Sequence, residues 1–101
     1  MFSVIFLDNQ NHVLRYQEMF HGSIATTTVY PREIARLALK LNAAAIICSH
    51  NHPSGNAKPS TQDKSLTLGI QKVMELIEVR LVDHIVVGGG QTVSFAERGW
   101  L

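Results

Sequence analysis

The chain has 101 residues, the size of one ordinary domain with a single core. Hydrophobic residues make up 46% and charged residues 17% of the sequence, which is typical of a globular protein and excludes a disordered one. The net charge is +1 with mixed signs along the chain, so no basic stripe is available for a phosphate backbone, and direct nucleic-acid binding is not expected.

The cysteine count and the apolar segments bear on the compartment. The single cysteine, Cys48, cannot form an intrachain disulfide, which fits a reducing environment. The sequence has no signal-like segment and no apolar run of membrane-spanning length. These features predict a cytoplasmic protein without a membrane partner.

The first half of the chain predicts a hairpin followed by a helix. Phe2–Leu7 and His12–Phe20 are rich in strand-forming residues and flank a cluster of turn residues at 8–11. Residues 22–28 are expected to form a loop or a short extended piece. Pro31 suits the first turn of a helix, whose apolar face repeats at helical spacing through Ile34, Leu37, Ala38 and Leu41.

The second half predicts a strand, a loop, a helix and a strand–turn–strand unit. Ala43–Cys48 is a short apolar run, expected to be a strand buried on both faces, and 50–59 is expected to be loop. A helix from near Ser60 has one apolar face, formed by Leu66, Ile70, Val73, Met74 and Ile77. Ile85–Val87 and Thr92–Phe95 flank a glycine-rich tight turn. The order β-β-α-β-α-β-β predicts an α/β domain with a mixed sheet and two main helices.

His50, His52 and Asp63, which follow the apolar strand, have the spacing of a metal site. In extended backbone, His50 and His52 point to the same face, so both imidazoles can reach one ion. Asp63 lies in the first turn of the following helix, and the loop can return it to the histidines. Two nitrogens and one oxygen leave a fourth position open, as in a catalytic zinc site. The alternative is that the histidines belong to an ordinary polar loop and that Asp63 is only a carboxylate at a helix start.

Ser60 has two interpretations. It can cap the second helix, with Asp63 three residues later in a variant of the capping box. Its hydroxyl can also donate to the oxyanion that forms when activated water attacks a carbonyl. A cap accepts a hydrogen bond while an oxyanion partner donates one, so both roles are compatible.

A hydrolase also needs a general base. Glu18, on the second strand of the hairpin beside Met19 and Phe20, is the preferred candidate. Glu33 is the alternative, although a carboxylate in the first turn of a helix is already explained by the helix dipole. His84, beside Asp83, is expected to open a strand as an edge histidine; its alternative role is to support a metal ligand.

The run His50-Asn51-His52-Pro53, with Ser60 and Asp63, matches the JAMM metalloprotease signature, and the whole chain resembles the RadC family of JAB/MPN-type domains. Further marks are Pro31-Arg32-Glu33-Ile34, Pro53-Ser54-Gly55, Asp83-His84-Ile85 and Ser94-Phe95. The resemblance implies a JAB/MPN fold related to the cytidine deaminases, with zinc held by His50, His52 and Asp63, an upstream Glu as base and Ser60 at the transition state. A deaminase itself would need His-x-Glu and Pro-Cys-x-x-Cys, which the sequence lacks.

The resulting hypothesis is a JAMM-type zinc hydrolase that cleaves a peptide or isopeptide amide in a protein or peptide substrate. The alternatives are a non-enzymatic interaction module and an accessory protein of DNA repair, a label that RadC-type members carry by tradition. Longer members have an N-terminal helix-hairpin-helix region, which these residues do not contain. The edge strands of the hairpin offer a route to a homodimer or to an extended substrate.

Overall fold

The structure is a computed structural model, and it describes residues 1–21, 29–52 and 57–101. Its elements follow the predicted order: β1 (Phe2–Leu7), β2 (Val13–Phe20), α1 (Pro31–Lys40), β3 (Ala45–Asn51), α2 (Thr61–Leu76), β4 (Arg80–Gly88) and β5 (Gln91–Ser94). The expectations for 22–28 and for Pro53-Ser54-Gly55 lie outside the described residues. None of the described helices is long and apolar enough to cross a membrane.

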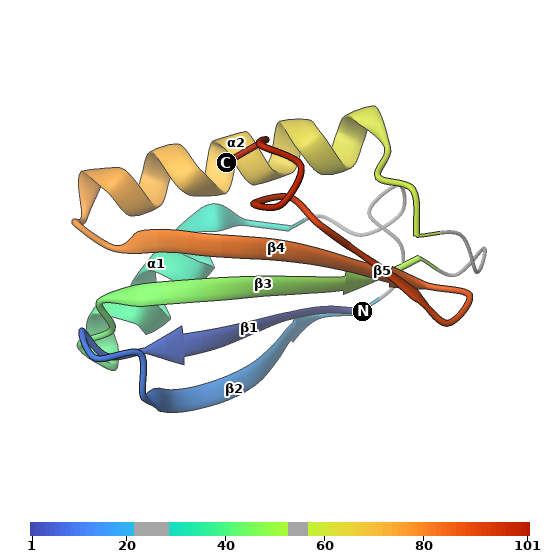
Figure 1. The fold of residues 1–101 in the computed structure, drawn as a ribbon. Coiled ribbons are helices and arrows are strands. Elements are labelled where there is room, and N and C mark those ends of the chain that lie inside the picture. Colours follow the sequence, from blue (N-terminus) through green and yellow to red (C-terminus); the bar gives the residue numbers. More distant parts are fainter. Residues whose placement is uncertain (22–28, 53–56) are drawn as a thin grey trace.

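The strands form one mixed sheet in the order β2-β1-β3-β4-β5 (Figure 1). β3 and β4 run parallel, and the other neighbouring pairs are antiparallel. A parallel pair needs a crossover connection, and α2 supplies it between β3 and β4. The carboxyl end of β3 and the first turn of α2 therefore meet at the same end of the domain (Figure 1).

Both helices contribute to one hydrophobic core against the same face of the sheet. Phe2, Val4 and Phe6 alternate along β1, as Ile46 and Cys48 do along β3, so these side chains share a face. The helices cover that face with the buried side chains Ile34, Ala35, Ala38, Ile70 and Met74. The apolar faces predicted for the two helices are confirmed, because Leu37, Leu41, Leu66, Val73 and Ile77 also pack against this core.

Two strand predictions were wrong in detail. β3 does not stop at Cys48: it continues through His50 and Asn51, because β1 and β4 both pair with this segment. It is also not buried on both faces, since Ile47 is half-buried while its neighbours Ile46 and Cys48 are fully buried. β4 begins at Arg80, five residues earlier than predicted from Ile85, so the polar pair Asp83-His84 lies inside the strand.

Candidate metal centre

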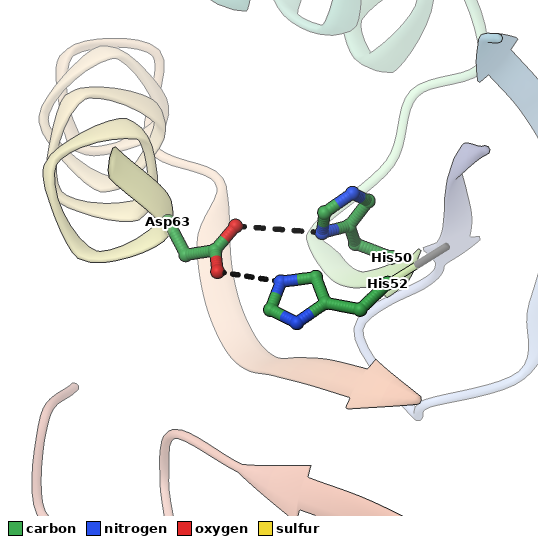
Figure 2. A group of neighbouring side chains, drawn as sticks. All are labelled: His50, His52 and Asp63. Carbon is green, nitrogen blue, oxygen red and sulfur yellow. Dashed lines mark hydrogen bonds and ion pairs between the residues drawn. The ribbon is translucent and has the colours of Figure 1, made fainter. Parts of the chain in front are cut away.

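The three predicted ligands converge at the junction of β3 and α2. His50 lies in β3, His52 follows the strand, and Asp63 is in the first turn of α2. The Nδ1 atom of His50 is 3.4 Å from Oδ1 of Asp63, and Nε2 of His52 is 2.7 Å from Oδ2 (Figure 2). One ligand atom from each residue lies within 4.8 Å of the others, so the three can hold a single metal ion.

Local structure fixes each part of this arrangement. His50 is held between Phe2 of β1 and Val86 of β4 by the sheet register. Asp63 is held by the predicted capping box: the Ser60 amide donates to its Oδ2 (2.7 Å), and its own amide donates to the Ser60 Oγ (3.1 Å). The carboxylate therefore points back across the helix start toward the histidines.

The hydrogen bonds around this group are incomplete in the way that a metal site requires. His50 and Asp63 are 1% and 0% exposed. Within the described residues, both ring nitrogens of His50 and the Oδ1 atom of Asp63 are buried without a hydrogen-bond partner. Burying such atoms unpaired is costly, and a cation that binds a ring nitrogen and the carboxylate removes most of the cost. The residues present therefore fit a divalent metal.

The electrostatic environment favours the protonation states that bind metal. Burial lowers the pKa of His50 below its ordinary value of 6.5, against the opposing charge of Asp63. Burial raises the pKa of the Asp63 carboxyl, but hydrogen bonds from Ser60 and His52 outweigh it, and the net pKa is lower than usual. A neutral imidazole and an ionised carboxylate are the forms that coordinate a cation.

The ligand set has three members among the described residues, which leaves room for a non-protein ligand. Cys48 lies two residues before His50 on the same face of β3, but it is not part of the group. Its thiol is fully buried, and burial raises its pKa to about 12. A thiol in that state is a core side chain and not a metal ligand.

Glu18 and Glu33, the two candidate bases, line the same cavity of about 360 Å³ between β2 and α1. Glu18 is exposed. In the sheet register it lies opposite Ser3 of β1, and Ser3 in turn lies opposite Ser49 of β3. Glu33 forms an ion pair with Arg36. Neither carboxylate belongs to the described group of His50, His52 and Asp63, and the choice between the two bases stays a prediction.

Sequence reasoning did not find the partner of His84. The expectation of an edge histidine is wrong, because His84 is 0% exposed and lies inside β4. Its Nδ1 atom is hydrogen bonded to the Thr67 hydroxyl, one helical turn after Asp63. The only signal available was a threonine four residues after the candidate ligand Asp63, on the same side of the helix. Asp83 does not bind the ring; its carboxylate accepts from the His84 and Ala96 amides and from the Ser94 hydroxyl.

A second cavity, of about 380 Å³, adjoins the start of α2. Its lining includes Lys58, Lys64 and Arg98 around an apolar floor of Ala57, Pro59, Val93 and Trp100, with Gln91 at its edge. The Lys64 ammonium lies 4.1 Å from the centre of the Trp100 ring, which packs edge-on against Phe95. Trp100 thus anchors the chain end to the first turn of the helix that carries Asp63.

The chain is thus a small α/β domain in which a His-His-Asp group that could hold a metal ion lies at the end of a parallel strand pair. The family model described as the RadC-like JAB domain matches residues 1–100. The chain therefore belongs to the RadC-like JAB domain family, as its resemblance indicated, and the match covers essentially its whole length.

Proposed function

We propose that this chain is a zinc-dependent hydrolase of the JAMM type that cleaves a peptide or isopeptide amide. The observation that carries the proposal is the group of the buried His50 and Asp63 with the half-buried His52, in which one ligand atom from each lies within 4.8 Å of the others. When bound there, zinc supplies Lewis-acid polarisation of a carbonyl and activation of water. Family membership supports the same chemistry, and the proposed substrate is a protein or peptide.

Side chains of the chain are proposed to stabilise the oxyanion and to transfer the proton. Ser60 Oγ accepts from the Asp63 amide, so its own proton stays available to donate to a developing oxyanion. The Ser60 residue is exposed, which keeps its hydroxyl within reach of a substrate. Glu18 is proposed to take the proton of the attacking water and to pass it to the leaving amine. Glu33 is the weaker candidate, because Arg36 already pairs with its carboxylate.

The proposal is tested first by metal content. The chain is purified with added zinc, and zinc is measured against protein for the natural sequence and for a His50→Ala, His52→Ala double variant. We expect about one equivalent in the first and none in the second. A matched control is His12→Ala, which removes an exposed histidine of the β1–β2 turn. Equal zinc in the double variant and the natural chain would exclude the site.

A second candidate function is a non-enzymatic interaction module that keeps the fold and the metal. It is favoured by one observation: neither Glu18 nor Glu33 belongs to the described His-His-Asp group. The two candidates separate on a panel of isopeptide-linked and linear peptides, assayed with Glu18→Gln and Glu33→Gln. Zinc-dependent cleavage that Glu18→Gln abolishes supports the hydrolase, whereas stoichiometric zinc without cleavage of any substrate supports the module.

The cellular location is part of the same proposal. Cys48 is a free, fully buried thiol. Together with the lack of a spanning helix among the described residues, this supports a cytoplasmic protein. Fractionation of cells that express the chain with a C-terminal epitope tests it.

A further inference from the structure

A buried hydrogen-bond chain connects α2 to β4 beneath the metal ligands. The Thr67 hydroxyl donates to the main-chain carbonyl of Asp63 at 2.8 Å. With its proton used in this way, the hydroxyl offers only a lone pair to the Nδ1 atom of His84, with which it is hydrogen bonded. The His84 ring must therefore carry its proton on Nδ1, and Nε2 is left as an acceptor.

That acceptor has no partner among the described residues. His84 is 0% exposed, and its Nε2 atom is buried and unpaired. The ring is fixed by aromatic neighbours, with Phe95 stacked at 4.7 Å and Phe2 edge-on at 5.6 Å between ring centroids. It cannot turn toward solvent without breaking these contacts and the Thr67 bond. An unpaired buried acceptor is destabilising, so it calls for a functional reason.

His50 has a ring nitrogen that needs an acceptor when the other one binds a metal. Its side chain lies on the same sheet face as His84, on the adjacent parallel strand, one alternation further along, since Cys48 pairs with His84 and His50 with Val86. The two rings share a neighbour, because Phe2 packs against both. If one ring nitrogen of His50 binds a metal, the other carries a proton that needs an acceptor.

We infer that His84 is a positioning residue for the candidate metal centre: its Nε2 atom accepts from the free ring N–H of His50 across one buried water, since the two atoms are not directly hydrogen bonded. The Asp63 carbonyl, Thr67, His84 and the His50 ring then form one continuous buried chain from one metal ligand to another. This chain fixes the orientation of the His50 ring, and its proton, before the ion arrives. The inference rests on the metal binding in the proposed function.

Two amide substitutions at the same position separate the acceptor from the bulk of the ring. In His84→Asn, the amide can still donate to Thr67, but the side chain is too short to offer an acceptor where Nε2 was. In His84→Gln, the amide oxygen reaches that position. We expect zinc affinity, measured by competition with a chelator, to fall about 10- to 100-fold in His84→Asn and only a few-fold in His84→Gln. Thr67→Val, which removes the hydroxyl that fixes the tautomer, should behave like His84→Asn.

The controls identify which proposal fails. His12→Asn makes the same substitution at an exposed histidine and should leave the affinity unchanged. Equal affinity in His84→Asn and the natural chain, or equal loss in the Asn and Gln variants, would overturn the role of His84 while leaving the zinc site intact. A natural chain that binds no zinc would overturn both proposals.

A second measurement does not depend on the folding of any variant. Long-range nitrogen–proton spectra of the natural, metal-free chain should show His84 with a protonated Nδ1 and an unprotonated Nε2, the rarer neutral tautomer. Added zinc should shift the His84 Nε2 resonance while this pattern persists. A proton on Nε2 in the metal-free chain would overturn the inference.

Discussion

Burial shifts the pKa values of the histidine and of the carboxylate at the candidate metal centre in opposite directions. It disfavours the charged form of each, so it keeps His50 neutral but opposes ionisation of Asp63. The Ser60 amide and His52 reverse the effect at Asp63 through hydrogen bonds to its carboxylate. The helix cap therefore stabilises α2 and also favours the ionised form of Asp63 that a metal ion would need.

The two roles of Ser60 can be separated by substitution. Ser60→Gly removes the hydroxyl but leaves a residue tolerated at a helix start, so the free energy of unfolding should fall by only a few tenths of a kcal/mol. Loss of an oxyanion donor should lower kcat about 100- to 1000-fold. Ser60→Thr, which keeps the hydroxyl, should retain most of both. Urea unfolding and steady-state kinetics check this, and an unchanged kcat in Ser60→Gly would leave the residue as a cap alone.

His84 makes the stability of the metal-free chain depend on pH. Burial, with a smaller contribution from His50, lowers its pKa from 6.5 to about 4, against the opposing charges of Asp63 and Asp83. Between these values the unfolded chain binds more protons than the folded one. The contribution of His84 to the free energy of unfolding is therefore complete above about pH 6.5 and is lost as the pH drops toward 4. The loss from this group is about 3 kcal/mol at most.

The measurement is urea unfolding at about pH 7 and about pH 5, with chelator present. His50 has a lowered pKa too and contributes in the same direction, so the natural chain alone does not isolate His84. In His84→Gln the loss of stability on acidification should be smaller than in the natural chain. An identical loss in both would show that His84 does not titrate in this range.

His52 and Asp63 are 11 positions apart in sequence, yet Nε2 of His52 lies 2.7 Å from Oδ2 of Asp63. The unit β3–α2–β4 explains this proximity. A parallel strand pair brings the end of β3 level with the end of β4, and the crossover helix starts above that end. The helix start was predictable from Ser60 and Asp63, because capping chemistry is local. The convergence of the ligands was predictable only through the motif, because spacing alone does not fix the path of the connecting loop.

The parts of the fold that sequence reasoning missed depend on long-range partners. The strand was expected at Ile85–Val87, with His84 at its opening, whereas β4 begins at Arg80. In the structure, Ser94 and the amide of Ala96 satisfy the Asp83 carboxylate, and Thr67 satisfies one nitrogen of His84. These partners lie in other elements, so no pattern within residues 80–84 could reveal them.

The Asp83 carboxylate is expected to hold the segment after β5 against β4. Asp83→Ala leaves the Ser94 hydroxyl and the amides of His84 and Ala96 without their acceptor, and should lower the free energy of unfolding by about 2 kcal/mol. Ser94→Ala removes one of these bonds and should cost about 1 kcal/mol. Urea denaturation measures both, with Lys72→Ala on the exposed side of α2 as the control. Changes below 0.5 kcal/mol, the usual range for surface sites, would contradict the role.

At the scale of the whole molecule, a chain of 101 residues buries one modest core, so a ligand that joins a strand to a helix contributes noticeably to stability. Zinc at about 1,000 times its Kd should add about 4 kcal/mol to the free energy of unfolding. The thermal midpoint should rise with zinc and fall with chelator. The His50→Ala, His52→Ala variant should show no shift, and an equal rise in that variant would place the zinc elsewhere.

The contact between Lys64 and Trp100 gives the domain a built-in optical probe. Trp100 is the only tryptophan of the chain, and the ammonium above its ring belongs to the residue that follows Asp63. Indole emission responds to a nearby positive charge, so a small displacement of the first helical turn changes its intensity. We therefore expect a metal ion added to the His-His-Asp group to change the fluorescence of the unmodified protein, without a dye or a coloured metal.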